Sequence, residues 1–114
     1  MYRPYHLIGM EALVSIGKAA VYGESTGAPQ SRVAEVAAAA KRNLEVGDVL
    51  DGEGGSMVYG NIMEAQQADA DQLVPIGLSN GAKLLNPVSR GTMVRYGDVE
   101  MPEEGFAASL RRKH

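Results

Sequence analysis

The hydrophobic and polar positions of the chain follow two patterns, one typical of a helix and one typical of short strands. Residues 6–22 carry apolar side chains at spacings of three and four, which predicts a helix from His6 to Tyr22. Its apolar positions make two neighbouring stripes, a wider face than a surface helix needs. The first stripe contains Leu7, Met10, Leu13 or Val14, Gly17 and Val21, and the second contains Ile8, Ala12, Ile16 and Ala19. We therefore expect this helix to dock on another domain or another subunit.

A repeat with a shift of 44 positions organises the rest of the chain. Residues 41–50, KRNLEVGDVL, correspond to residues 85–94, LNPVSRGTMV. The shift places Leu44 on Val88, Gly47 on Gly91, Val49 on Met93 and Leu50 on Val94. Each copy predicts a tight corner that ends in glycine, which adopts positive φ at little steric cost, followed by a strand. The expected fold is mainly β with an N-terminal helix and a pseudo-twofold core of strand–corner–strand repeats.

Turn-forming residues separate the predicted elements. Gly23 is a typical stop for the first helix, and the sequence GESTGAPQS after the helix predicts a linker. Residues 35–40 are expected to form a strand that enters the first corner, although alanine favours helix. Residues 61–71 are expected to be loop with a helical turn, and Pro75 disfavours a central strand near it. The domains predicted are a helical linker segment at 1–31, a β domain at 32–105 and a tail at 106–114.

The composition excludes several classes of protein and site. With 114 residues the chain has the length of one domain. It contains no cysteine, which excludes disulfides, thiolate metal sites and a cysteine nucleophile, and fits a reducing compartment such as the cytoplasm. A net charge of −3 gives no basic face for a nucleic acid. No run of 18 apolar residues exists, so we expect no membrane partner.

The glycine-rich stretch DGEGGS at residues 51–56 is the first candidate for a ligand site. It lacks the GxGxxG order and a following helix, and its two carboxylates would repel an anion. A flexible connection is therefore favoured over a phosphate cradle. Tyr59 follows apolar strand residues and is expected to be a half-buried sheet residue rather than a ligand platform.

The remaining chemistry-bearing side chains are sparse. His6 has no second histidine near it for a metal pair, so a capping or packing role is favoured over a contact with another domain, and both over a metal site. No serine has a histidine base in an evident frame. We predict no catalytic, cofactor-binding or metal-binding residue. The possible ligand or interdomain contacts are His6, Asp51, Glu53, Ser56 and Tyr59.

Residues 40–99 resemble the SAF domain, a β-clip module found in sialic acid synthases, type III antifreeze proteins, sugar-acid dehydratases and flagellar P-ring chaperones. The resemblance rests on AKRNLEVGDVL at residues 40–50 and on LVPIGLSNGAKLLNPVSRGTMVRYGDVE at residues 73–100. Its more specific part is the spacing of Gly77, Gly81, Leu84, Gly91 and Asp98. The resemblance implies a β-clip fold.

The N-terminal segment points to one group of proteins among those that contain an SAF domain. Residues 2–29, YRPYHLIGMEALVSIGKAAVYGESTGAP, are similar to the segment that joins the catalytic part to the SAF domain in homoserine-dehydrogenase-like NAD(P)-dependent oxidoreductases, reductoisomerase-like enzymes included. The resemblance implies a non-catalytic C-terminal accessory domain whose parent enzyme uses NAD(P) and whose partner is an upstream catalytic domain or a second copy. The alternatives are a free-standing module that binds a sugar acid and, less favoured, a module that binds ice or a protein surface.

Overall fold

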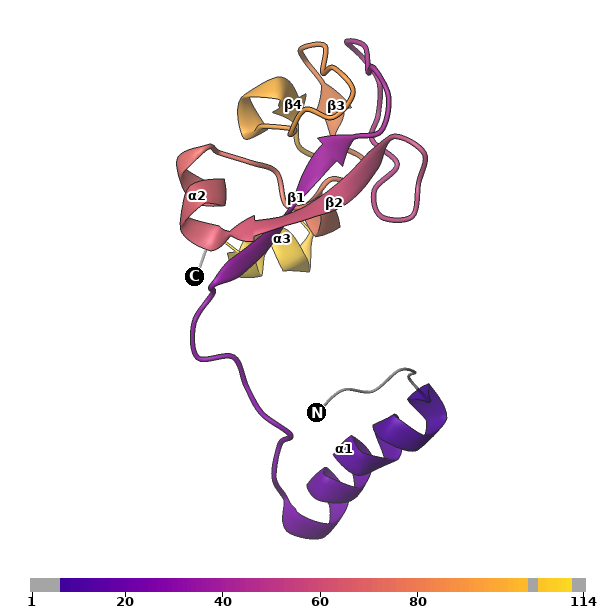
Figure 1. Ribbon diagram of the computed structural model, residues 1–114, viewed down its shortest axis with the longest axis vertical. Helices are drawn as coiled ribbons and strands as arrows, with labels where there is room; N and C mark the ends of the chain where they lie inside the picture. Colours follow the sequence, from indigo (N-terminus) through magenta and orange to yellow (C-terminus); the bar gives the residue numbers. More distant parts are fainter. Residues whose placement is uncertain (1–6, 103–104, 112–114) are drawn as a thin grey trace. The chain divides into compact units, whose positions relative to one another are not determined.

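The computed structural model describes residues 7–102 and 105–111 and divides the chain into two units between Ser31 and Arg32. The first unit contains helix α1 (Ile8–Tyr22), and the second contains the other described elements (Figure 1). Helix α1 ends as predicted: Gly23 has φ 66°, and its N–H donates to the Ala19 carbonyl at 3.1 Å. The predicted start of the helix at His6 lies outside the described residues.

Two antiparallel strands, β1 (Ala34–Ala40) and β2 (Val58–Glu64), form the centre of the second unit. Their register runs from Ala34 opposite Glu64 to Ala40 opposite Val58. The other edge of β1 is also paired, because its alternate residues bond to segments near Val74 and Val94. The N–H of Ala38 donates to the Val74 carbonyl at 2.8 Å, and the N–H of Val94 donates to the Ala38 carbonyl at 2.9 Å. β1 is therefore bonded on both edges.

The remaining elements are short. They are α2 (Ala65–Ala70), the 3-10 helix η1 (Ile76–Leu78), β3 (Lys83–Leu84), the 3-10 helix η2 (Tyr96–Asp98), β4 (Val99–Glu100) and α3 (Phe106–Arg111). β3 pairs with β4 in a second small antiparallel sheet. The core of the unit lies between these elements and β1. Its largest fully buried apolar side chains are Leu44, Leu50, Val58, Val74, Leu84 and Val94.

The 44-residue repeat reappears as matched hydrogen bonds. Leu44 and Val88, which the shift places on each other, bond reciprocally at 2.9 and 3.1 Å, so an approximate twofold axis passes between them. Three further pairs of bonds are related by the same shift. These are Ala40 N to Thr92 O (3.0 Å) and Leu84 N to Asp48 O (2.8 Å), Gly91 N to Ala40 O and Gly47 N to Leu84 O (both 2.8 Å), and Val94 N to Ala38 O and Leu50 N to Ala82 O (both 2.9 Å). Gly47 and Gly91 both have positive φ, 91° and 81°.

Two predictions about the fold need correction. The described chain is a mixture of helices and small antiparallel sheets rather than mainly β, because many β contacts around the corners are single bridges. Residues 61–64, predicted as loop, continue β2, since β1 offers a full edge for pairing. The described core contains no tyrosine and includes four small alanines, Ala37 to Ala40, each 0% exposed.

Candidate functional site

The loop at residues 51–56 is closed by its own aspartate. The Asp51 carboxylate accepts hydrogen bonds from the backbone N–H and the hydroxyl of Ser56 and from the N–H of Met57. Desolvation raises the pKa of Asp51, but these hydrogen bonds outweigh it and hold the pKa below its ordinary value. A side chain at Gly55 would collide with this carboxylate. The sequence-predicted residues Asp51 and Ser56 therefore contact each other and serve to shape the loop.

Glu53 lies in a small pocket beside Asp51. The pocket has a volume of about 320 Å³ and is lined by Asp51, Glu53, Ile76, Gly77 and Asn80. Two carboxylates in one small pocket favour cations over anions. The described residues nevertheless contain no group of three His, Asp or Glu side chains that could hold a metal ion. His6 lies outside the described residues.

Tyr59 lies in a different pocket, of about 490 Å³, which also contains the cationic side chains of Lys41 and Arg90. The pocket is lined by Ala40, Lys41, Tyr59, Arg90 and Gly91. Tyr59 on β2 lies opposite Ala39 on β1, and Met93 bridges Ala39 from the other edge. Lys41 follows Ala39 by two residues and belongs to the same face of the sheet. Gly91 offers no side chain there, which leaves the space open between Tyr59 and Arg90.

The two cationic side chains of this pocket, Lys41 and Arg90, differ in their hydrogen-bond partners. The Lys41 ammonium donates to the Gly55 carbonyl, which leaves two of its three protons for another group. The Arg90 guanidinium makes no hydrogen bond or ion pair with any residue that the structure describes, while its backbone N–H is fixed by the Asn43 side chain at 2.9 Å. None of the described residues that line the pocket carries a carboxylate. Its chemistry suits an anion.

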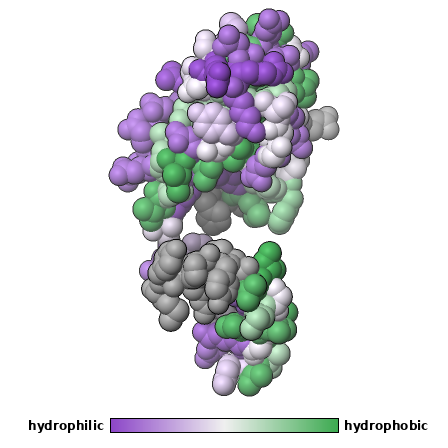
Figure 2. Space-filling view, turned by 45° about the vertical axis from the view of Figure 1, so that its right-hand side comes forward, coloured by the Kyte–Doolittle hydropathy of each residue, from purple (hydrophilic) through white to green (hydrophobic). Residues whose placement is uncertain are grey.

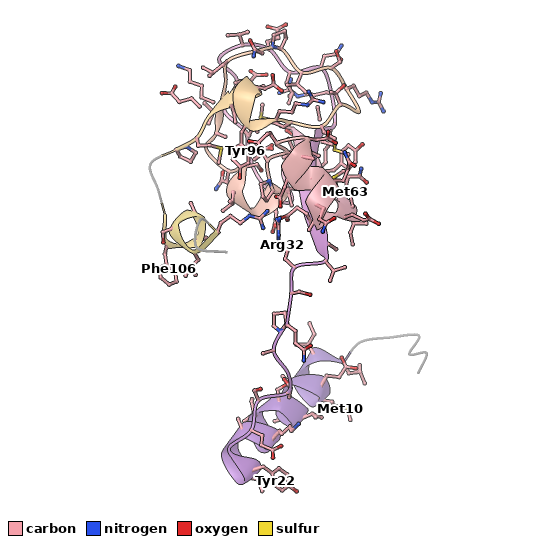
Figure 3. All side chains as sticks on the ribbon, turned by 90° about the vertical axis from the view of Figure 1, so that its left-hand side faces the viewer. Met10, Tyr22, Arg32, Met63, Tyr96 and Phe106 are labelled. Carbon is pink, nitrogen blue, oxygen red and sulfur yellow. The ribbon has the colours of Figure 1, made fainter. Side chains whose placement is uncertain are left out.

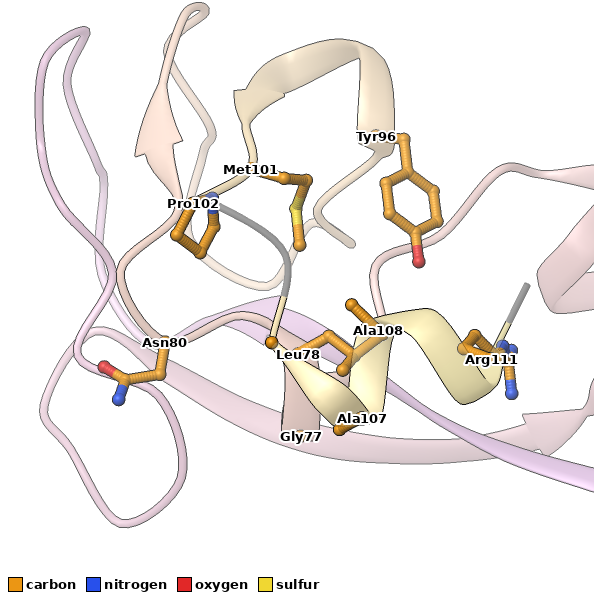
Figure 4. A pocket seen from close by; sticks show the side chains of 10 residues that line it. Gly77, Leu78, Asn80, Tyr96, Met101, Pro102, Ala107, Ala108 and Arg111 are labelled. Carbon is orange, nitrogen blue, oxygen red and sulfur yellow. The ribbon is translucent and has the colours of Figure 1, made fainter. Parts of the chain in front are cut away.

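A third pocket was not predicted from the sequence. It has a volume of about 460 Å³ and lies between η1, η2 and α3 (Figure 4). Its walls are mainly apolar, from Leu78, Met101, Ala107 and Ala108, and its polar groups come from Asn80, Tyr96 and Arg111. Sequence reasoning missed this pocket because residues 106–111 gave no signal beyond a short apolar patch before a basic end.

The Arg111 end of this pocket is occupied by an ion-pair network. Arg111 pairs with Glu35 and lies 3.8 Å from Asp69, and Arg32 pairs with the same two carboxylates. Burial raises the pKa of the neighbouring Tyr96 hydroxyl, and the two carboxylates add to the rise while the arginines oppose it. Because Arg111 is already paired, the network serves to fix α3 on β1 and α2 rather than to bind an anion.

Helix α1 exposes many large apolar side chains. None of its residues is buried, and its side chains project on all sides (Figure 3). In Figure 2, hydrophobic side chains lie uncovered along it. The large apolar residues that stay more than 60% exposed are Ile8, Met10, Leu13, Val14, Ile16, Val21 and Tyr22.

Helix α1 also lacks the means to be stable alone. It has 15 residues, a length at which isolated helices are marginal in water. Gly9 and Gly17 each lower its helical propensity by about 1 kcal/mol relative to alanine. Its N-terminus has no side-chain cap and its last turn has no basic residue. Because helical propensity and capping do not stabilise this helix, packing against a partner must stabilise it.

No family model and no curated protein matches the chain. No helix in the part of the chain described by the structure is long and apolar enough to cross a membrane.

Proposed function

We propose that the chain is an SAF-type accessory and assembly domain, with a β-clip fold, of a larger homoserine-dehydrogenase-like NAD(P)-dependent oxidoreductase. The bonds related by the 44-residue shift support the β-clip part of this proposal, because they give two equivalent glycine corners around one axis. The resemblance of residues 2–29 and 40–99 supports the parent enzyme. In this role the chain contributes no catalytic group and no NAD(P) contact, and its partner is an upstream catalytic domain or a second copy.

The single observation that carries the proposal is the exposed helix α1. Its residues are apolar around most of the circumference, and none of them is buried. Burying a side chain such as Ile8 or Ile16 contributes about 1.5–3 kcal/mol, so this helix gains most of its stability from a binding partner. A free-standing ligand-binding module would have no use for such a helix.

The test begins with the coding sequence upstream of Met1, which the proposal expects to encode a dinucleotide-binding domain. That domain and the 114-residue chain are expressed as separate polypeptides, and their association is measured by sedimentation. We expect a complex, and we expect Ile16→Lys to abolish it because Ile16 is 61% exposed on the second apolar stripe. The matched control is Ser15→Lys, which adds the same charge on the polar side of the helix.

Two outcomes would overturn this proposal. One is an upstream sequence without a dinucleotide-binding domain. The other is an association that Ile16→Lys and Ser15→Lys affect equally, since contact through the apolar stripe requires the two positions to differ.

The pocket of Tyr59, Lys41 and Arg90 supports a second candidate function, the binding of a sugar acid. The Arg90 guanidinium, which has no ion-pair partner among the described residues, lines one open space with the Lys41 ammonium and the Tyr59 hydroxyl, and no described carboxylate lines it. The acidic pocket of Asp51 and Glu53 is unsuited to this ligand because its charge is of the wrong sign. If a sugar acid binds this domain, Arg90 rather than Asp51 recognises it.

A titration with glucuronate, followed by backbone amide shifts, separates the two sites. Binding at the cationic pocket should shift the amides of residues 40–41, 59 and 90–91 and should be lost in Arg90→Ala. Arg95→Ala serves as control, because Arg95 is an exposed arginine outside this pocket. Absence of shifts at millimolar glucuronate would rule out this second function.

A further inference from the structure

One stripe of helix α1 repeats every seven residues. Leu7, Val14 and Val21 are spaced by seven, and Met10 and Gly17 follow the first two by three. This is the a and d pattern by which two helices pack along a shared seam. All four large side chains of the stripe are exposed: Leu7 is 48%, Met10 67%, Val14 68% and Val21 73% exposed. The stripe is therefore an uncovered helix-packing seam.

Gly17 makes a groove in the middle of the seam. The groove has a volume of about 690 Å³, and besides Gly17 it is lined by Leu13, Val14, Val21 and Tyr22 and by the charged Lys18 and Glu24. A β-carbon built on Gly17 would meet no atom within 4 Å. Another helix can approach closely at this point, because no side chain separates the two backbones.

The charges beside the seam select the direction of the second helix. Glu11 and Lys18 are the only charged residues of α1, and they also lie seven residues apart, each directly after a d position. These are e positions, whose charges decide the orientation of helix pairs. In a parallel pair each e position faces a g position of the other helix, and the g positions of this seam, Leu13 and Ala20, carry no charge. An antiparallel copy places each Glu11 opposite the Lys18 of its partner, about an axis near Val14 and Ser15.

We infer that the occupant of this seam is a second copy of the chain and that the two α1 helices pair in an antiparallel manner. The inference rests on the proposed assembly role and names the partner for one of the two stripes. Pairing would exchange the contact that Glu11 already makes and the surface pair of Lys18 with Glu24, which at 3.7 Å between exposed side chains is weak. The second stripe, with Ile8 and Ile16, is not part of this seam and remains available for a catalytic domain.

The inference is tested first by exchanging charges in the complete 114-residue chain. Glu11→Lys and Lys18→Glu should each weaken self-association on the order of tenfold, because two attractive contacts per dimer become repulsive. An equimolar mixture of the two variants should regain wild-type affinity, since every contact is again between opposite charges. Sedimentation equilibrium measures all four samples. A parallel pair would be weakened by neither exchange, because its e positions face uncharged g positions, and that result would overturn the inference.

Cysteine crosslinking tests the relative direction of the two α1 helices independently. Because the chain has no native cysteine, every disulfide formed must join introduced cysteines. In the antiparallel pair, Val14→Cys should oxidise to a disulfide-linked dimer, because the two copies of position 14 meet at the axis. Val21→Cys alone should not, but it should crosslink with Leu7→Cys when the two variants are mixed. A parallel pair would crosslink Val21→Cys with itself, and that result would overturn the inference.

The outcomes separate this inference from the proposed function. A monomeric 114-residue chain that still binds an upstream dinucleotide-binding domain through Ile16 would overturn the antiparallel pair and leave the accessory role standing. An antiparallel dimer without an upstream dinucleotide-binding domain would confirm the helix pair and overturn the proposal that the chain belongs to an oxidoreductase. A monomer that binds neither would overturn both.

Discussion

Helix α1 and strand β1 are both apolar segments, but they lie at opposite extremes of burial. The large side chains of α1, such as Ile8 and Val21, are 81% and 73% exposed, whereas Ala37 to Ala40 of β1 are 0% exposed. The segment with the larger apolar side chains is thus the uncovered one. The cause is pairing: β1 is bonded on both edges by segments of its own unit, while none of the described residues of its own unit buries α1. Hydrophobicity indicates that a segment will be buried, and only the partners decide where.

The largest effect that distinguishes the two regions is expected from a cavity in the β unit. Leu84→Ala removes a side chain that is 0% exposed in β3, which should lower the free energy of unfolding by about 2–5 kcal/mol. The matched control is Leu85→Ala at the next position, where the side chain is 50% exposed and the loss should be much smaller. Urea unfolding measures both. Equal losses would contradict the burial assigned to β3.

Substitutions at the two glycine corners should cause the next largest loss of unfolding free energy, and the loss should be equal at both corners. Gly47→Ala and Gly91→Ala each force a side chain into positive φ, which costs roughly 1–2 kcal/mol per residue, although neither β-carbon would meet another atom. Gly97→Ala is the control, because Gly97 has no positive φ and equally open space. A difference of several-fold between the two corners, measured by urea unfolding, would contradict their equivalence.

The Asp51 loop should show a pH-dependent effect of smaller size. The folded-state pKa of Asp51 is lowered, so its contribution is fully present above the unfolded value of about 3.9 and is lost as the pH falls through the folded value. Wild type should therefore be more stable than Asp51→Asn at neutral pH, and the difference should shrink below about pH 4. Thermal unfolding at both pH values measures this. A difference that stays constant with pH would refute the role of the carboxylate.

The smallest effect is expected on α1. Ile16→Ala removes an exposed side chain in the other unit and should change the unfolding free energy of the β unit by no more than about 0.5 kcal/mol. The unfolding of the β unit can be followed through Tyr59 and Tyr96 by near-ultraviolet absorbance. A loss comparable to that of Leu84→Ala would mean that α1 belongs to the core, and the comparison between the two regions would fail.

The sequence alone determined the features that depend on local rules. Gly23 stops α1 because glycine takes the left-handed conformation without strain, and the 44-residue repeat located both glycine corners. The two apolar stripes of the N-terminal helix were also visible, because a period near 3.6 residues needs no tertiary information. The candidate residues Asp51 and Ser56 followed from the glycine-rich loop, and they do contact each other.

Tertiary structure decided what depends on contacts between distant segments. The run of four alanines favours helix locally, but in β1 it is held as strand because hydrogen bonds to β2, Val74 and Val94 outweigh a small difference in propensity. Tyr59 joins Lys41 and Arg90 only when the second corner folds beside β1. Contacts of this kind cannot be predicted from the spacing of residues along the chain, because each depends on which strand edges remain free for hydrogen bonding in the folded structure.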